Sequence, residues 1–172
     1  LISGRIISVF AGFGIVLMLF LITTIILNFS SPEKNIFKFI SKSISIYFYP
    51  AVLTSLIYCL LPFSFFFDRV ALADTLLSFF GLTSFLFSLL LSKYPRLDLS
   101  LILGVVLGLA WLTKSPAIYF IALSIGTFVF LNLNKLSLIF LPLISSLVSF
   151  IIYNILRLGP QFQMIALRNR DY

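Results

Sequence analysis

The residues of this chain that could do chemistry are a few ionisable side chains that interrupt long apolar runs. Asp68, Arg69 and Asp74 lie close together in the sequence, and Lys114 stands apart from them. A carboxylate can position a reaction partner or bind a divalent cation, and Lys or Arg can bind a phosphate through charge-assisted hydrogen bonds. These residue types therefore indicate a polar site that accepts an anion.

Other chemistries are excluded within this chain by its composition. It contains no His, so it cannot form a Ser-His-Asp triad, a Cys-His pair or a His-ligated metal site. Its single cysteine, Cys59, cannot form a disulfide within the chain and lies in an apolar run typical of a packing residue. Neither a glycine-rich phosphate loop nor a dinucleotide-binding fingerprint occurs. The net charge of +7 comes from cations placed singly between apolar runs, which favours loop charges over a nucleic-acid interface.

The composition predicts an all-α, polytopic bundle of transmembrane helices. Hydrophobic residues make up 61% of the 172 residues and charged residues 10%, with a mean hydropathy of +1.19. A soluble domain carries about 25% charged residues, and a helix that crosses a membrane needs about 20 apolar residues. About six spans are predicted, over residues 6–27, 44–67, 71–91, 97–113, 116–132 and 136–156. Residues 157–172 are predicted to begin an external loop.

The start of the chain and two local patterns complete this organisation. The sequence begins with Leu1 inside an apolar pattern, so we expect a fragment of a longer protein that forms one partial transmembrane domain, 1–172. The segment 36–43 mixes apolar residues with two lysines and predicts either a short interfacial helix or an extension of the second span. Gly104 and Gly108 form a Gly-x-x-x-Gly pattern, which favours close packing of two helices.

The distribution of Lys and Arg predicts which ends of the spans face the cytoplasm. Between the spans, the cations on one side of the membrane are Lys34, Lys38, Lys42, Lys93, Arg96 and Lys135, and those on the other side are Arg69 and Lys114. Because loops rich in Lys and Arg stay in the cytoplasm, the smaller group is predicted to face outward. Arg5, Arg157, Arg168 and Arg170 fall on that side as well. We therefore expect an integral protein of the plasma membrane whose polar site faces outward.

Asp74 is the residue for which a functional role is predicted. It lies about one turn inside the third predicted span, where an ionisable group costs up to about 2.5–3.5 kcal/mol at a helix centre and less near the interface. A partner, a cavity or water must offset that cost, and Arg69 is the nearest candidate in the sequence. The alternative is helix-terminus chemistry, in which Asp68 caps the helix and Asp74 favours its positive end.

The cations on the outward side each have two interpretations. Lys114 could hold a phosphate as a point charge, or it could extend to the lipid headgroups at the membrane rim. Arg5 is either a substrate ligand or a rim residue of the first span. Three arginines near the end of the chain could face an anion or be solvated in a loop: Arg157, Arg168 and Arg170. Together these residues predict a membrane-level pocket for a lipid phosphate.

Three segments resemble the GT-C membrane glycosyltransferases, which include the protein O-mannosyltransferases, the aminoarabinose transferase and the RgtA/B/C/D-like group. Residues 68–80, DRVALADTLLSFF, are similar to the acidic segment of that family. Residues 103–116, LGVVLGLAWLTKSP, are similar to its Gly-x-x-x-Gly-Leu-Ala-x-Leu-Thr-Lys-Gly segment, with Ser115 in place of the final glycine. Residues 3–8, SGRIIS, resemble the opening of the family's second helix. The three segments are distributed over residues 3–116, a stretch that covers most of the chain, with the family's spacing.

The resemblance implies a polytopic enzyme that transfers a sugar from a polyprenyl-phosphate donor to an acceptor glycan, lipid or protein on the external face. It matches Asp74 to the family's second acidic position, near the donor phosphate or a divalent metal, and Lys114 to the lysine that contacts the lipid phosphate. Arg69 and Arg5 match positions that are often basic and are expected to bind substrate. The principal catalytic acid, the general base of the family, lies in an external loop before Leu1, so the resemblance implies that this chain alone is inactive.

Two other functions fit the same sequence. A transporter or flippase of an amphipathic anion would also place cations in a membrane bundle, but such proteins usually carry them in broken helices near the middle of the membrane. A non-catalytic membrane scaffold would give Asp74 and Lys114 no role beyond stability. The predicted function is therefore a membrane glycosyltransferase whose partners are membrane lipid and a polyprenyl-phosphate sugar. No nucleic acid, and no cofactor other than a divalent metal, is expected.

Overall fold

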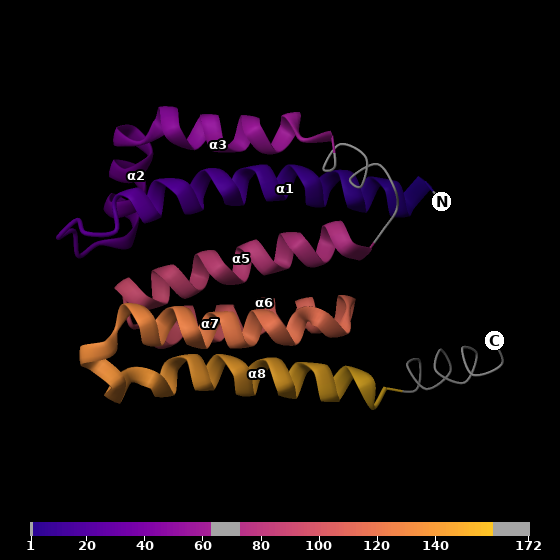
Figure 1. Cartoon of the computed structure of the whole chain (residues 1–172). Helices are drawn as coiled ribbons and strands as arrows, with labels where there is room; N and C mark the ends of the chain where they lie inside the picture. Colours follow the sequence, from indigo (N-terminus) through magenta and orange to yellow (C-terminus); the bar gives the residue numbers. More distant parts are fainter. Residues whose placement is uncertain (1, 63–72, 160–172) are drawn as a thin grey trace.

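The computed structural model describes residues 2–62 and 73–159, and these residues form a bundle of α-helices (Figure 1). The helices are α1 (Ile2–Leu27), α2 (Ile36–Ile46), α3 (Phe48–Leu60), α5 (Ala73–Lys93), α6 (Leu97–Thr113), α7 (Ile118–Leu131) and α8 (Phe140–Arg157). Two 3-10 helices, η1 (Ser115–Ala117) and η2 (Leu133–Ile139), lead into α7 and α8. The described residues contain no strand, so the all-α prediction is confirmed.

The long helices lie side by side with roughly parallel axes (Figure 1). α1 packs between α3 and α5, α5 packs on α6 and α7, and α6 packs on α8. The starts of α1, α5 and α7 and the ends of α6 and α8 meet at one end of the bundle, on the right in Figure 1, which is named here the Asp74 end. The opposite end, which holds α2 and the connections that follow α1, α5 and α7, is named the α2 end.

Three helices are long and apolar enough to cross a membrane: Arg5–Leu27, Ala73–Lys93 and Ser137–Arg157. The pair α2 and α3 makes a fourth candidate, although the two helices are bent by 78° relative to one another. α6 and α7 are apolar but shorter. The described residues therefore contain three to four candidate spans, and the predicted membrane bundle is confirmed at this coarser level rather than as six spans.

The clearest difference from the prediction concerns the second run, 44–67. α3 begins only at Phe48, and the residues before it belong to α2, which turns away sharply. The physical reason is that α2 is apolar on one side and carries lysines on the other, and such a helix cannot continue a span through hydrocarbon. Of the two interpretations of segment 36–43, the structure therefore has the separate helix. The end of run 44–67 and most of the predicted loop 157–172 lie outside the described residues.

Small polar side chains join the helices where their backbones approach closely. Hydroxyl groups donate hydrogen bonds from Ser55 to the carbonyl oxygen of Val16 (3.2 Å), from Ser88 to that of Ser124 (3.0 Å) and from Ser100 to that of Leu141 (2.6 Å). These bonds link α3 to α1, α5 to α7 and α6 to α8. Serine suits such contacts because it is small and its hydroxyl can donate to a backbone carbonyl oxygen of the neighbouring helix.

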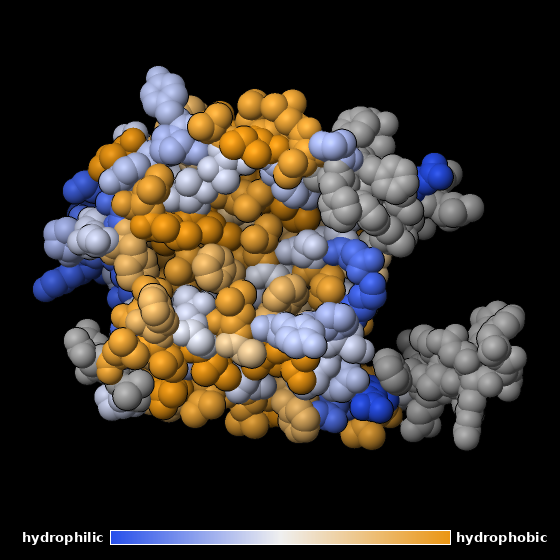
Figure 2. All heavy atoms as spheres, viewed as in Figure 1, coloured by the Kyte–Doolittle hydropathy of each residue, from blue (hydrophilic) through white to orange (hydrophobic). Residues whose placement is uncertain are grey.

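Many large apolar side chains are exposed on the bundle, and hydrophobic residues make up much of the face drawn in Figure 2. Phe10, Phe13 and Phe130, for example, are 72%, 63% and 78% exposed. Soluble proteins rarely leave contiguous apolar surface of this kind in contact with water. The surface is therefore compatible with lipid contact along the sides of the bundle, as expected of a membrane protein.

Lys93, the last residue of α5, connects several segments at the α2 end. Its ammonium donates hydrogen bonds to the carbonyl oxygens of Phe29 (2.7 Å) and Ser31 (2.9 Å) in the connection after α1. The same nitrogen lies 3.7 Å from the ring centroid of Phe39, which is fully buried in α2. Lys93 was predicted as a cytoplasmic loop charge, whereas the structure shows a partly buried cation that connects three segments.

Tyr94 makes a second connection to the same segment. Its hydroxyl donates a hydrogen bond to the carbonyl oxygen of Glu33 (2.7 Å), and its ring meets that of Phe39 edge-on, with 5.9 Å between ring centroids. Burial, with the negative charge of Glu33 as the smaller cause, raises the pKa of the Tyr94 hydroxyl above its ordinary value. The hydroxyl therefore remains a donor throughout the neutral range.

Replacement of Lys93 by Met is expected to lower the free energy of unfolding by about 2 kcal/mol, because it removes two charged hydrogen bonds and a cation–π contact. Met keeps most of the aliphatic stem, so the loss measures the ammonium. Unfolding in detergent, followed by temperature or denaturant, gives the value. The control is Lys34→Met, which removes an exposed lysine from the same end and is expected to change stability by less than about 0.5 kcal/mol. Equal effects of the two variants would contradict the assignment.

Candidate functional site

The ionisable side chains of the described residues gather at the two ends of the bundle. The Asp74 end holds Arg5, Asp74, Lys114 and Arg157, and the α2 end holds Glu33, Lys34, Lys38, Lys42, Lys93, Arg96 and Asp98. η2, which contains Lys135, also belongs to the α2 end. The two groups of cations that the sequence distinguished therefore lie at opposite ends, as far as their members are described.

Asp74 lies in the first turn of α5, where it is the second residue of the helix. This is closer to the end of the bundle than the predicted depth of about one turn. The N-terminus of a helix carries partial positive charge, which stabilises a carboxylate. The side chain is also 50% exposed, and the Ser78 hydroxyl donates to the backbone carbonyl oxygen of Asp74 (2.9 Å). The helix end and solvent thus offset much of the cost of this charge.

Lys114 is the residue at which α6 ends. Its backbone is extended (φ −162°, ψ 144°), and its N–H donates the last hydrogen bond to the carbonyl oxygen of Ala110 (3.3 Å). Pro116 follows in the first turn of η1, where its missing N–H is tolerated, and the chain turns into α7. A cation is favoured at this C-terminal helix end by the helix dipole. The break therefore presents the ammonium of Lys114 beside the start of α5.

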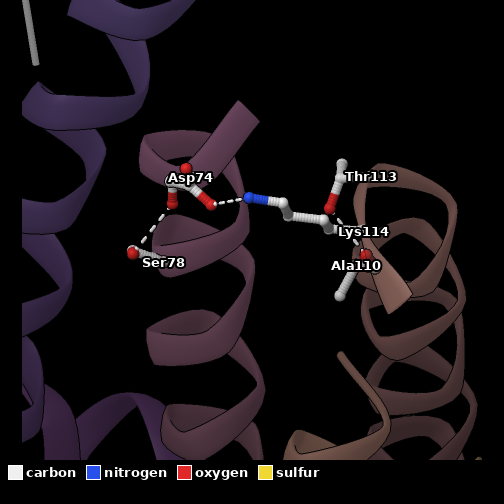
Figure 3. Close-up of polar contacts among 5 residues, drawn as sticks. All are labelled: Asp74, Ser78, Ala110, Thr113 and Lys114. Atoms are coloured by element: carbon white, nitrogen blue, oxygen red, sulfur yellow. Dashed lines mark hydrogen bonds and ion pairs between the residues drawn. The ribbon is translucent and has the colours of Figure 1, made fainter. Parts of the chain in front are cut away.

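Asp74 and Lys114 form an ion pair between α5 and α6 (Figure 3). Lys114 Nζ lies 2.5 Å from Asp74 Oδ1, and the side chain of Lys114 is 47% exposed. The structure thus brings together two of the residues predicted for the site, 40 positions apart in the sequence. Sequence reasoning named Arg69 as the partner of Asp74; Arg69 and Asp68 lie outside the described residues, and the partner found here is Lys114.

An aromatic stack braces the end of α6 against α8. The rings of Trp111 and Tyr153 lie nearly parallel, at 12°, with 4.7 Å between their centroids. The Arg157 guanidinium lies 5.7 Å from the centroid of the Tyr153 ring. Because Trp111 precedes Lys114 by less than one helical turn, the stack fixes the position from which Lys114 reaches α5. Tyr153 was not predicted from the sequence. Its position four residues before Arg157 on an apolar helix could have indicated that the two side chains lie close together.

The remaining predicted cations are not joined to this ion pair. Arg5 lies near the start of α1 at the same end, is exposed, and forms no ion pair or hydrogen bond with a described residue. It lines an apolar hollow on the surface of α1 with Ile6, Val9 and Phe10. Arg168 and Arg170 lie outside the described residues. The described site is therefore the Asp74–Lys114 pair, with Arg5 and Arg157 elsewhere at the same end.

The chemistry open to this pair follows from its unused hydrogen-bonding capacity. An ammonium has three donors, and Asp74 occupies one of those of Lys114, so two remain for the oxygens of an anion. Asp74 Oδ2 accepts no hydrogen bond from a described residue and can accept one from a ligand hydroxyl. The pair can hold a phosphate and an adjacent hydroxyl group at the end of the apolar bundle.

A divalent metal fits the described side chains poorly. Asp74 is the only carboxylate that residues 2–62 and 73–159 place at this end, and within those ranges no three His, Cys, Asp or Glu side chains cluster. The ammonium of Lys114 beside Oδ1 would repel a cation. The metal that the resemblance associated with Asp74 therefore has no ligand set among the described residues.

Three features of the site bear on its function: the Asp74–Lys114 ion pair, its location at the end of an apolar bundle, and the aromatic stack behind Lys114. Comparison of the chain with protein-family models, with curated proteins and with solved structures found no match.

Proposed function

We propose that the chain forms part of a membrane glycosyltransferase that moves a sugar from a polyprenyl-phosphate donor to an acceptor on the external face of the plasma membrane. The observation that carries the proposal is the half-exposed Lys114 ammonium, which Asp74 holds at the end of a bundle with apolar sides. A lipid-linked phosphate needs this combination, because its headgroup requires a cation and its polyprenyl chain requires an apolar surface.

Lys114 is proposed to bind the donor phosphate and to stabilise it as a leaving group. When the bond between the anomeric carbon and the phosphate oxygen breaks, negative charge grows on the phosphate. The two free donors of Lys114 can meet that charge, and a fixed donor contributes most where charge develops in the transition state. Lys114 is held by Asp74 and backed by the Trp111 stack, so little reorientation is needed.

Asp74 is proposed to fix Lys114 and to offer Oδ2 to a hydroxyl group of the donor sugar. The resemblance implies that another acid, before Leu1, deprotonates the acceptor as it attacks the anomeric carbon with inversion. The proposed donor site is therefore formed by the described residues, and the base that completes it is expected elsewhere in the protein.

The proposed orientation of the bundle rests on its charges. The α2 end carries most of the Lys and Arg of the described residues, which supports a cytoplasmic position for it and an external position for the Asp74 end. We propose about six spans, with the shorter helices α6 and α7 crossing together with their flanking residues.

The proposal is tested with membranes from cells that express the protein from its complete gene. A set of radiolabelled polyprenyl-phosphate sugars is supplied, and release of free polyprenyl phosphate is measured against membranes without the protein. Release of polyprenyl phosphate together with labelled acceptor is the expected result. Movement of an intact donor across the bilayer without loss of its sugar would support a transporter instead. Failure to consume any donor would contradict the proposal.

A further inference from the structure

α2 has one side packed on the protein and one side free. Its inner residues are buried or half-buried: Ile36, Phe39, Ile40, Ser43 and Ile44. Its outer residues are all exposed: Phe37, Lys38, Ser41, Lys42, Ser45 and Ile46. This division follows the helical repeat, so that the two lysines and two serines form the middle of the outer face and Phe37 and Ile46 its edges.

The inner side fixes the direction of the outer face. Asn35 Oδ1 accepts a hydrogen bond from the backbone N–H of Phe37 (3.0 Å) and so caps the helix. Asn28 Nδ2 donates to Ser43 Oγ (2.8 Å), and Phe39 is fully buried beneath the ammonium of Lys93. α2 is therefore attached to the ends of both α1 and α5, and its lysines point away from the bundle.

The outer face has uncompensated positive charge. Lys38 and Lys42 are one helical turn apart, a spacing at which like charges destabilise a helix. Lys34 lies just before the helix. Glu33 is the one acidic residue that lines a shallow surface depression with Lys38 and Lys42. Neither Lys38 nor Lys42 forms an ion pair with a described residue. An external anion would relieve this repulsion.

The position of α2 relative to the apolar helices indicates which anion is available. α3 starts two residues after α2 and turns by 78°, so α2 crosses the end of the bundle instead of continuing along it. Phe37, near the start of α2, and Tyr49, near the start of α3, are each 85% exposed, and Phe48 is 48% exposed. Exposed aromatic residues between apolar spans and charged segments are typical of the membrane–water interface.

We propose that the outer face of α2 binds the headgroups of anionic phospholipids. Lys38 and Lys42 contact lipid phosphates, Ser41 and Ser45 hydrogen-bond to headgroup oxygens, and Phe37 reaches the boundary with the acyl chains. Amphipathic helices with this composition lie in the plane of the interface, and basic residues there are attracted to anionic lipid. The inference concerns the α2 end only and is independent of sugar transfer at the Asp74 end.

The test places a fluorescent reporter on this face. Phe37→Trp in a Trp111→Phe background gives a protein with one tryptophan, because Trp111 is the only tryptophan of the chain. The protein is reconstituted in bilayers that contain either brominated phosphatidylglycerol or brominated phosphatidylcholine, whose bromine atoms quench a nearby indole. Quenching by the anionic lipid is expected to exceed that by the zwitterionic lipid. The association constant of the anionic lipid relative to the zwitterionic one is expected to rise about fivefold for each lysine that contacts a headgroup.

The matched variants separate charge from position. Lys38→Gln with Lys42→Gln is expected to make the two lipids quench equally while quenching by phosphatidylcholine remains, whereas Arg96→Gln at the same end is expected to keep the preference. Both lysines are exposed, so the double variant is expected to fold, and its unfolding curve checks this. Equal quenching in the unaltered lysine background, or a preference that survives in the double variant, would overturn the proposal. Absence of quenching by either lipid would place α2 in water and overturn it as well.

Discussion

Exchange of the charges of Asp74 and Lys114, by Asp74→Lys together with Lys114→Asp, is expected to lower sugar transfer at least about a hundredfold while the protein stays folded. The exchanged pair still attracts across α5 and α6. The cation, however, now starts from α5, and the carboxylate stands where the donor phosphate is proposed to bind. Loss of a positioned donor at a site of developing negative charge costs about 10²–10³ in rate.

The expected effect on stability is much smaller. Half-exposed ion pairs contribute about 0–1 kcal/mol to the free energy of unfolding, and the exchange keeps the pair. Each helix end now carries the charge that its dipole disfavours, which costs about 0.3–1 kcal/mol at each position. We therefore expect the free energy of unfolding, measured in detergent, to fall by about 1–2 kcal/mol. A hundredfold fall in activity caused by unfolding would require a much larger loss of stability.

A matched exchange at the other end of the bundle provides the control. Arg96 and Asp98 form the other ion pair of the described residues, at 2.8 Å and with side chains 60% and 54% exposed. Arg96→Asp with Asp98→Arg repeats the same change of charges at the α2 end and is expected to leave transfer within about twofold of the unaltered protein. If the Asp74–Lys114 exchange also kept normal transfer, the pair would have a structural role alone, and the proposed donor site would be wrong.

The sequence was sufficient to single out Asp74 and Lys114 but not to predict that they pair. Asp74 and Lys114 stood out because ionisable residues are rare in apolar runs, and each lies at the edge of such a run. Their contact joins residues 40 positions apart and depends on how α5 and α6 pack, which no local pattern encodes. Arg69, five residues from Asp74, was the only partner that local reasoning could name.

Most helices were predicted from the sequence, but the boundary between α2 and α3 was not. The runs that became α1, α5, α6 and α8 were each located to within a few residues, because a long apolar run leaves little choice but a helix. Hydropathy could not locate the 78° bend between α2 and α3, since apolar residues continue on both sides of Tyr47. The contacts of the Lys93 ammonium were missed for a related reason. Its hydrogen-bond partners are backbone carbonyl oxygens, which every residue has, so the sequence does not show which of them it meets.

Substitution of Gly104 by Leu is expected to lower the free energy of unfolding by about 3 kcal/mol or more. A Cβ atom at Gly104 would lie 2.7 Å from the Cβ of Val148 and 2.8 Å from the backbone oxygen of Ser145, both in α8. A side chain can turn aside, but a helix backbone cannot, so α6 and α8 would have to separate. Overpacking typically costs about 1–3 kcal/mol even where neighbours can adjust.

The control is a glycine on the neighbouring helix. Gly126 in α7 is exposed, and a Cβ placed there would meet nothing within 4 Å, so Gly126→Leu is expected to be neutral or stabilising. Gly108 should fall between the two, because its added Cβ would approach only the side chain of Ile152, at 3.0 Å or more. Unfolding of the three variants in detergent measures this order. Similar losses at Gly104 and Gly126 would mean that α6 and α8 do not pack along Gly104 and Gly108.

The same substitution connects helix packing to the site. The contact of α6 with α8 begins at the hydrogen bond from Ser100 to Leu141, passes Gly104 and ends at the stack of Trp111 on Tyr153. Apolar side chains gain little by leaving lipid, so close packing at small residues carries most of this association in a membrane. If Leu at 104 separates the helices, the brace behind Lys114 opens and the ammonium loses its fixed position beside Asp74. Gly104→Leu is therefore expected to lower sugar transfer even at temperatures where the protein remains folded, and Gly126→Leu is not.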